Sequence, residues 1–293
     1  MRKLGLSAIT AVLLLGCTNT GGANQADSET AERQLVFSDE FDGSKLDRSK
    51  WNVEGMEFWV NNEQQAYTDS PETISFASDV EGAEGGVLIL KPVFKPGADT
   101  LADRGADFVS GRIDSRGKFD FTHGRAEARI RMPDNVGAWP AFWLLGNGKW
   151  PDTGEIDIME YVGDKSWTAV AVHGPGYSGE TPIVKRQSFP DGEDATGWHV
   201  YGVEWTDETM VFDVDGRAFY TVTRAEIEKH GEWRFDTPKH LILNFAVGGI
   251  YPYKVFKIED PYYGLPQETA DAIKRGEVQM EVDWVRVWSI SEN

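Results

Sequence analysis

The chain has 293 residues, and 40% of them are hydrophobic, which is enough for a folded core and too many for a disordered chain. Its 29 Lys and Arg are outnumbered by 48 Asp and Glu, so the net charge is -19. This balance argues against a nucleic-acid partner, because phosphate binding needs a basic surface, and it weighs more weakly against a heavily sulfated substrate. The single cysteine, Cys17, excludes an intrachain disulfide framework and a Cys-based zinc finger.

The N-terminal segment has the features of a bacterial export signal. Met1–Lys3 is basic, and the apolar run that follows, residues 4–15, is shorter than the roughly 20 residues of a transmembrane helix. The residues before and including Cys17, Leu-Leu-Gly-Cys, resemble the bacterial lipobox, whose cysteine is lipidated; a plain signal with a cysteine nearby is the alternative. We therefore expect a signal peptide over residues 1–16 and a lipid on Cys17. The protein is then secreted and lipid-anchored to the bacterial cell envelope, at the outer membrane in a Gram-negative host.

A stretch rich in Gly, Ser, Thr, Asn and Glu predicts a flexible tether over residues 17–34, and the folded domain is expected over 35–293. Within that domain, short segments of β-type residues alternate with turn signals. Strands are predicted over residues 87–90, 125–131, 168–173, 199–205, 210–214, 241–247 and 282–288, and the last two are the clearest. Asp215-Gly216, between two of these apolar segments, predicts a hairpin turn.

Helix-forming sequence is scarce. One short helix is predicted over residues 223–229, and another over 266–275, where a proline stands at the start and a glycine follows the end. No internal repeat and no second linker is evident in the sequence. Many short strands in a domain of about 260 residues predict a single all-β sandwich.

Residues 154–160, Gly-Glu-Ile-Asp-Ile-Met-Glu, carry the strongest chemical signal. In a strand, alternate side chains share a face, so Glu155 and Asp157 point the same way. Strict alternation would turn Glu160 into the core, where an unpaired carboxylate is costly. A β-bulge at 158–159 resolves the conflict, because one extra residue returns Glu160 to the face of the other two acids. The segment therefore predicts three acids on one open face of a sheet.

Three neighbouring carboxyls match the chemistry of glycoside hydrolysis. Carboxyl groups that lie so near one another cannot all ionise freely, so at least one of them is expected to have a raised pKa. The reaction needs one ionised carboxylate to attack the anomeric carbon and one protonated carboxyl to donate to the leaving oxygen. Two Glu side chains of one strand can lean together to the roughly 5 Å of a retaining enzyme. An acidic strand facing solvent and a calcium site are the alternatives.

The segment 154–160 resembles the signature of glycoside hydrolase family 16 in its bulged form, E-x-D-x-x-E, and the unbulged form of lichenase-type members is absent. Further segments are similar to laminarinase-type members, which are endo-1,3-β-glucanases: residues 37–42, 61–67, 111–117, 139–145, 173–176 and 283–286. The resemblance implies a concanavalin A-like β-jelly roll whose concave face forms a substrate cleft. It also implies that Glu155 is the nucleophile, Glu160 the general acid/base, and Asp157 the acid that influences the ionisation of its neighbours.

The same resemblance implies a set of substrate-binding residues. Flat aromatic rings stack on the apolar faces of sugars, and the aromatic candidates are Trp139, Trp143 and Trp59; for each of them, packing in the core is the alternative. The polar candidates are His173, Asn61, Asn62 and Arg116, for which a structural or solvated surface role is the alternative.

A structural calcium ion, bound on the convex side away from the cleft, is a further expectation from the family. Its ligands would be Glu40, Asp283 and a backbone carbonyl near Gly86. Calcium takes six to eight oxygens, and only two side chains are identifiable. We expect no cofactor for catalysis, because no His/Cys cluster predicts a catalytic metal and no Gly-rich loop predicts a nucleotide site.

Together these features predict a secreted, retaining endo-β-glucanase that acts as a monomer on β-1,3-glucan such as laminarin, with mixed-linkage β-1,3-1,4-glucan as a second substrate. A galactan hydrolase of the agarase or carrageenase kind is the runner-up, because it shares the bulged motif. A non-catalytic glycan-binding jelly roll is the other alternative, although such a protein is expected to have lost a catalytic carboxylate. Between residues 249 and 280 the chain departs from the family pattern, with Ile-Tyr-Pro-Tyr-Lys-Val and a helical insert where members more often carry Trp-Pro, so this loop is expected to affect specificity.

Overall fold

The computed structural model describes residues 33–99 and 106–290. The predicted signal peptide, the lipidation site Cys17 and the tether up to residue 32 lie outside the described residues. The chain divides into two units, Met1–Ala31 and Glu32–Asn293, and all the strands and helices below belong to the second. The first strand, β1 (Arg33–Asp39), begins two residues before Leu35, where the folded domain was expected to begin.

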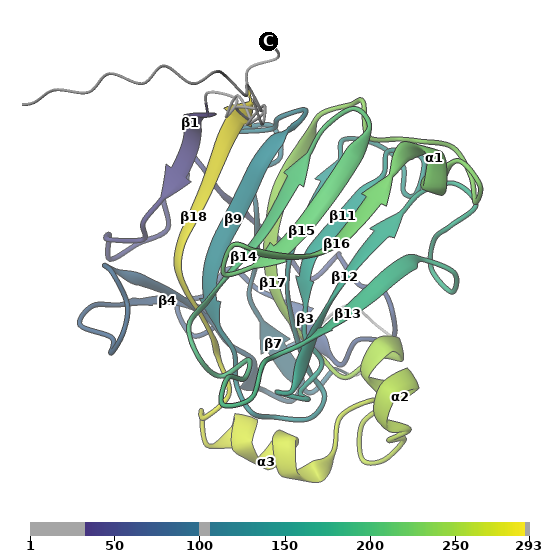
Figure 1. The fold of residues 1–293 in the computed structure, drawn as a ribbon. Helices are drawn as coiled ribbons and strands as arrows, with labels where there is room; N and C mark the ends of the chain where they lie inside the picture. Colours follow the sequence, from purple (N-terminus) through teal and green to yellow (C-terminus); the bar gives the residue numbers. More distant parts are fainter. Residues whose placement is uncertain (1–32, 100–105, 291–293) are drawn as a thin grey trace, which may run out of the picture. The chain divides into compact units, whose positions relative to one another are not determined.

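One large sheet has eight strands and is antiparallel throughout (Figure 1). Besides β1 it contains β4 (Ile74–Ala77), β5 (Val87–Leu90), β9 (Gly124–Arg131), β14 (His199–Trp205), β15 (Thr209–Val214), β16 (Arg217–Thr223) and β18 (Met280–Ile290). The strand order is β16-β15-β14-β9-β18-β5-β4, and β1 pairs with β18 outside this path. The last strand of the chain therefore contacts three others, β1, β5 and β9. We call this the outer sheet.

The second large sheet, which we call the cleft sheet, has seven antiparallel strands. Its strands are β2 (Asn52–Val53), β8 (Arg112–Asp114), β10 (Ala138–Gly146), β11 (Glu155–Glu160), β12 (Trp167–His173), β13 (Ile183–Ser188) and β17 (Lys239–Val247). They lie in the order β13-β12-β11-β10-β17-β8-β2, which puts β11 near the middle. A small third sheet joins β3 (Gln65–Tyr67), β7 (Phe108–Ser110) and β6 (Val93–Phe94), with β3 and β7 parallel.

The larger of two apolar clusters in the described part of the chain fills the space between the two large sheets. It contains Ala126 and Val285 from the outer sheet together with Phe142, Leu144 and Ile156 from the cleft sheet, and all five are fully buried. In β10 the buried positions alternate with half-buried ones, as expected for a strand with one face on the core and one face toward water. The predicted all-β sandwich is therefore confirmed, with two sheets packed face to face around one core.

The predicted strands are confirmed, since each of the seven is observed with ends within two residues of the expected ones. Asp215 and Gly216 form the predicted two-residue turn between β15 and β16, and both have positive φ (54° and 71°), which is the backbone of a type I′ hairpin.

Both predicted helices are observed as well, as α1 (Arg224–Ile227) and α3 (Gln267–Lys274). The Thr223 hydroxyl caps α1 by accepting the backbone N–H of Glu226. A third helix, α2 (Ile250–Phe256), was not predicted. No helix in the described ranges is long and apolar enough to span a membrane.

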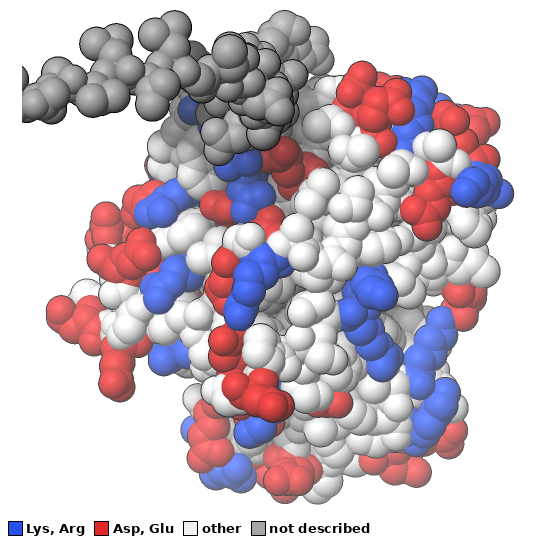
Figure 2. All heavy atoms as spheres, viewed as in Figure 1, with Lys and Arg blue, Asp and Glu red and all other residues white. Residues whose placement is uncertain are grey.

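Acidic and basic side chains are interspersed on the face of the outer sheet shown in Figure 2. Ion pairs join strands across this sheet: Arg125 contacts Asp213 at 2.8 Å, and Arg131 contacts Glu281. Acidic side chains of this sheet are therefore partly paired with basic ones, and neither of these two pairs lines the cleft described next.

Candidate active site

The exposed face of the cleft sheet carries an open cleft with a volume of about 500 Å³. Alternate residues of four neighbouring strands line it. They are Trp139, Ala141, Trp143 and Leu145 of β10, Glu155, Asp157 and Glu160 of β11, Ala171 and His173 of β12, and Asn244 and Ala246 of β17. The intervening residues, such as Phe142 and Ile156, belong to the core on the other face of the sheet. The period-2 pattern of the strands thus separates the cleft from the core.

The predicted bulge in β11 is confirmed by its register with both neighbours. Asp157 and Glu160 pair with Ala171 and Ala169 of β12, so three steps along β11 match two along β12. Against β10 the register shifts at the same place. Ile158 and Met159 are both buried in the core, and Glu160 returns to the cleft face. Because of the extra residue, all three acids of the segment line the same cleft.

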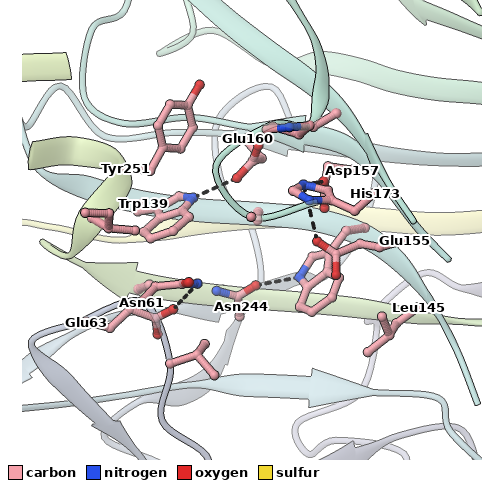
Figure 3. A pocket seen from close by; sticks show the side chains of 18 of the residues that line it. Asn61, Glu63, Trp139, Leu145, Glu155, Asp157, Glu160, His173, Asn244 and Tyr251 are labelled. Carbon is pink, nitrogen blue, oxygen red and sulfur yellow. Dashed lines mark hydrogen bonds and ion pairs between the residues drawn. The ribbon is translucent and has the colours of Figure 1, made fainter. Parts of the chain in front are cut away.

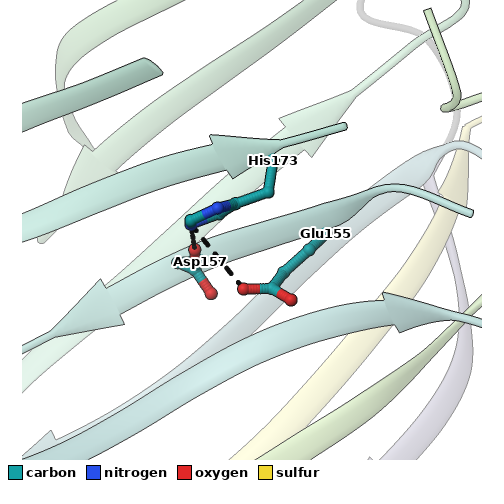
Figure 4. Close-up of side chains that lie close together, drawn as sticks. All are labelled: Glu155, Asp157 and His173. Carbon is teal, nitrogen blue, oxygen red and sulfur yellow. Dashed lines mark ion pairs between the residues drawn. The ribbon is translucent and has the colours of Figure 1, made fainter. Parts of the chain in front are cut away.

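Glu155, Asp157 and His173 form a compact cluster at one end of β11 (Figure 4). The His173 Nε2 lies 3.2 Å from Asp157 Oδ2 and 3.7 Å from Glu155 Oε1. Asp157 is only 4% exposed, and its Oδ2 has no hydrogen bond with suitable geometry. His173 is opposite Glu155 in the β11–β12 register, which is why the imidazole reaches both carboxyls.

Burial raises the pKa of all three carboxyls above their ordinary values. For Glu155 and Glu160 the next cause is the neighbouring charge of Asp157, while His173 acts in the opposite direction. The three groups therefore do not ionise independently, and the cleft holds protons on some of its carboxyls near neutral pH. This is the mixture of ionised and protonated groups that acid–base chemistry on a sugar needs.

Two tryptophans donate hydrogen bonds to the two glutamates. The Trp139 Nε1 donates to Glu160 Oε1 at 3.1 Å, and the Trp150 Nε1 donates to Glu155 Oε2 at 2.8 Å. Figure 3 shows Trp139 pointing toward Glu160 from the neighbouring strand. Trp150 comes from the loop between β10 and β11 and is 44% exposed. Each glutamate thus has its own indole donor.

Across β10 and β17 from the carboxyls, buried polar groups form a second wall of the cleft. Glu63 is 6% exposed, and its carboxylate accepts hydrogen bonds from Gln65 (2.6 Å) and Asn61 (3.3 Å). Asn244 links Trp143 to Tyr67, because it accepts the Trp143 N–H at 2.7 Å and donates to the Tyr67 hydroxyl at 3.1 Å.

The only basic group of this wall among the described lining residues is Arg112. Its guanidinium carbon lies 4.0 Å from the centroid of the Phe58 ring and 4.8 Å from that of Trp143, so the cation contacts two aromatic rings. Such a wall offers fixed donors and acceptors to sugar hydroxyls.

Helix α2 borders the cleft at the Glu160 end. Tyr251 packs edge-on against Trp139, with ring centroids 5.6 Å apart, and Lys254 forms an ion pair with Glu180 from the loop that follows β12. All four residues line the cleft. The segment in which the sequence departs from the family pattern therefore contributes directly to the site.

The structure brings together most of the sequence-predicted site residues. Glu155, Asp157, Glu160, Trp139, Trp143, His173 and Asn61 all line the cleft. Three predicted binding residues do not line it. Trp59 is 39% exposed and donates its N–H to the Glu63 carbonyl, Asn62 lies in the exposed turn beside it, and Arg116 is directed to Glu54 at 3.8 Å. Direct contact with a substrate in the cleft is therefore expected only of the predicted residues that line it.

Several cleft residues were not selected from the sequence, notably Glu63, Tyr67, Arg112, Trp150 and Asn244. A usable signal existed for Glu63, because alternate residues 61, 63, 65 and 67 share a face if this segment is extended. Arg112 and Arg116 occur in one motif, but only Arg112 is in a strand, and only its side chain is buried. Trp150 is in a turn-rich loop, where no periodic pattern indicates its direction.

The residues predicted to bind calcium do not fit that ion in this arrangement. Both oxygens of Glu40 pair with Arg286, at 2.8 and 3.1 Å. The buried carboxylate of Asp283 pairs with Arg129 and accepts the backbone N–H of Glu84. Guanidinium groups and N–H donors thus occupy the positions around these two carboxylates that a cation would need. Calcium binding stays a prediction without support from these contacts.

Comparison with known proteins identifies the family of the chain. The family model described as "Glycosyl hydrolases family 16" matches residues 58–286. The chain belongs to this family. A beta-glucanase from Rhodothermus marinus is 34% identical over 291 residues, which span 94% of this chain and 91% of that protein.

Solved structures from the same family agree with the fold. The endo-β-1,3-glucanase from Pyrococcus furiosus matches with a TM-score of 0.74 and 32% identity, covering 90% of this chain and 97% of that one. The laminarinase catalytic domain from Thermotoga maritima matches with a TM-score of 0.73 and 34% identity, covering 89% and 100%. The two packed sheets are thus the jelly roll of family 16, and the chain is a glycoside hydrolase.

Proposed function

We propose that this family 16 enzyme cleaves internal linkages of a β-1,3-glucan with retention of the anomeric configuration. The observation that carries the proposal is the bulge in β11, which puts Glu155 and Glu160 on the same wall of an open, tryptophan-lined cleft. The cleft is open rather than a closed pocket, so a long chain can pass through it. The relatives named as a beta-glucanase, an endo-β-1,3-glucanase and a laminarinase support this choice of substrate.

In the first step, the ionised carboxylate of Glu155 attacks the anomeric carbon. The bond from that carbon to the glycosidic oxygen breaks, and the protonated carboxyl of Glu160 gives its proton to the leaving oxygen. The product is a glycosyl ester of Glu155 and a free sugar hydroxyl. In the second step, the Glu160 carboxylate takes a proton from water as the water oxygen attacks the same carbon. The ester bond then breaks, which restores Glu155 as carboxylate and Glu160 as acid.

The hydrogen bonds and neighbours of Glu155 and Glu160 differ in a way that suits a nucleophile and a general acid. Glu155 receives the shorter indole hydrogen bond, 2.8 Å against 3.1 Å for Glu160, and it also lies near His173. Donors near a carboxyl favour its ionised form, as a nucleophile requires. The carboxyl of Asp157 lies beside Glu155, where its charge raises the pKa of both glutamates.

Hydrolysis of laminarin followed by ¹H NMR tests the proposal. We expect the β-anomer to appear first and the α-anomer only later by mutarotation, whereas initial release of the α-anomer would exclude retention. The variant Glu155→Gln is expected to abolish almost all turnover while laminarin still binds, with Glu57→Gln, outside the lining of the cleft, as the matched control. Offering lichenan, agarose and carrageenan in parallel separates the glucanase from the galactan hydrolases, because reducing ends released only from agarose would exclude the glucanase.

We further propose that the enzyme works as a monomer at the cell envelope, attached through a lipid on Cys17 and the residues that follow. The support is the lipobox-like sequence before the only cysteine. Fractionation of cells that express the full chain checks this, since Cys17→Ser is expected to move the enzyme from the membrane to the soluble fraction. A variant that stays in the membrane fraction contradicts lipid attachment.

A further inference from the structure

Trp150 makes a direct hydrogen bond to the proposed nucleophile. Its indole Nε1 donates to Glu155 Oε2 at 2.8 Å. The indole comes from the loop between β10 and β11, five residues before the glutamate, so the hydrogen bond closes this loop back onto the catalytic strand. The ring lines the cleft and is 44% exposed, and its centroid lies 6.1 Å from that of His173.

Two neighbours of Glu155, His173 and the Trp150 indole, favour its ionised form. Burial and the charges of Asp157 and Glu160 all disfavour the carboxylate form. The His173 Nε2 is closer to Asp157 (3.2 Å) than to Glu155 (3.7 Å), so its interaction is directed mainly to the aspartate. An N–H donor to an ionised carboxylate favours that form and is stronger than a hydrogen bond between neutral groups. The Trp150 indole therefore favours the ionised nucleophile through a direct N–H hydrogen bond, in addition to the nearby His173.

We infer that Trp150 is a positioning residue for Glu155, whose indole N–H fixes the rotation of the carboxylate and keeps it ionised for attack. This rests on the double-displacement mechanism proposed above. The hydrogen bond holds one oxygen of the carboxylate and thereby sets the plane of the other. Because the same ring is exposed in the cleft, a sugar bound against it also contacts the side chain that orients the nucleophile.

The variant Trp150→Phe tests the inference, because it keeps an aromatic ring and removes the N–H. Loss of a hydrogen bond to a charged group corresponds to a factor of about 10 to 100, so we expect kcat on laminarin to fall by that factor with KM changed less than about twofold. The acidic limb of the kcat/KM profile reports ionisation of Glu155 and is expected to move to higher pH, because the carboxylate has lost a donor. Trp150→Leu, which also lacks an N–H, is expected to show the same displacement of the limb.

The control is Trp198→Phe, in which the lost indole N–H donates to the backbone carbonyl of Glu81 at 3.0 Å, outside the lining of the cleft. This variant should keep the kinetics and pH profile of the native enzyme. Thermal unfolding of all three variants shows whether they are folded, and the exposure of Trp150 predicts that its variants are.

Two results would overturn the inference. A higher KM with unchanged kcat and an unmoved acidic limb would make Trp150 a sugar platform only, and native kinetics would give it no role in the reaction. Failure of the proposed function is seen separately in the native enzyme. A 2-fluoro-glycoside that traps the glycosyl ester should add its sugar mass to the peptide containing Glu155, and absence of that adduct would contradict double displacement whatever Trp150 does.

Discussion

Replacing Asp157 with Asn is predicted to move the whole pH–activity profile toward acid. Asp157 is buried beside both glutamates, and its charge is the second cause, after burial, that raises the pKa of Glu155 and Glu160. Asn has nearly the same shape and no charge, so the substitution removes the electrostatic effect while leaving the packing of β11 in place. Both glutamates are then easier to ionise.

The size of the effect follows from the geometry of the cluster. The facing oxygens of Glu155 and Asp157 lie within 4.8 Å of each other. Two unit charges at that separation repel by about 3.5 kcal/mol at an effective dielectric constant of about 20, which corresponds to about 2.5 pH units. Water in the open cleft and the nearby His173 weaken this repulsion, and the raised pKa of Asp157 itself leaves its carboxyl protonated over part of the titration. We therefore expect the pKa of Glu155 to fall by about 1–2 pH units, and that of Glu160 to fall in the same direction.

The assay is kcat/KM on laminarin as a function of pH for the native enzyme and Asp157→Asn. The acidic limb, set by ionisation of Glu155, should move to lower pH, and so should the basic limb, set by loss of the proton from Glu160. The direction is opposite to that expected for Trp150→Phe on the acidic limb, so the two variants check each other. Limbs that stay within about 0.3 pH units of the native ones would refute the electrostatic role of Asp157, and a basic limb that moves upward would refute its sign.

Two further predictions concern stability. His199 is buried, and its Nδ1 lies 2.8 Å from Asp215 while its Nε2 lies 3.0 Å from the Asp194 carbonyl. Burial lowers the pKa of His199, but the hydrogen bond to Asp215 and the charges of Asp215 and Glu193 raise it. The net shift is upward, despite the nearby Arg217. Protonated His199 therefore stabilises the fold fully below its unfolded-state pKa of about 6.5, and this stabilisation is lost as pH rises through the folded-state pKa. The difference in unfolding free energy between the native protein and His199→Gln should thus shrink from about pH 5.5 to pH 9 in urea titrations. A difference that grows with pH contradicts this. Phe142→Ala removes a fully buried ring between the sheets and should cost about 3–5 kcal/mol in the same assay, whereas Phe58→Ala in the cleft should cost much less, and equal losses would contradict the assignment of the core.

The chemistry of the site could be predicted further than its lining. Glu155, Asp157 and Glu160 were placed on one face because burial of Glu160 is unfavourable, and the bulge that this argument requires is present. Helix α2 was missed because Pro252 and aromatic or β-branched neighbours are weak helix formers. The proline is tolerated because it stands in the first turn, where its missing N–H leaves no intrahelical hydrogen bond unmade.

Residues outside regular periodic segments were the hardest to place. Arg116 was selected and Arg112 was not, although the two are four apart in one motif, because the end of β8 between them is fixed by pairing with β17 and β2. Burial of the Glu63 carboxylate in the wall of the cleft is offset by hydrogen bonds from Gln65, Asn61 and Tyr67. Trp150 depends on a loop conformation. Such contacts are set by tertiary structure, which local patterns do not encode.

The central position of β18 has a consequence for the way the domain is completed. This strand is the last in the sequence, yet it is the shared neighbour of β1, β5 and β9. While the chain is being synthesised or translocated, those three strands have unsatisfied edges until residues 280–290 arrive. The outer sheet is thus completed only when residues 280–290 are available, and β1, which follows the proposed tether, acquires its pairing strand only then. Deletion of residues 280–290 would leave β1 without its pairing strand and expose the edges of β5 and β9, a state prone to aggregation.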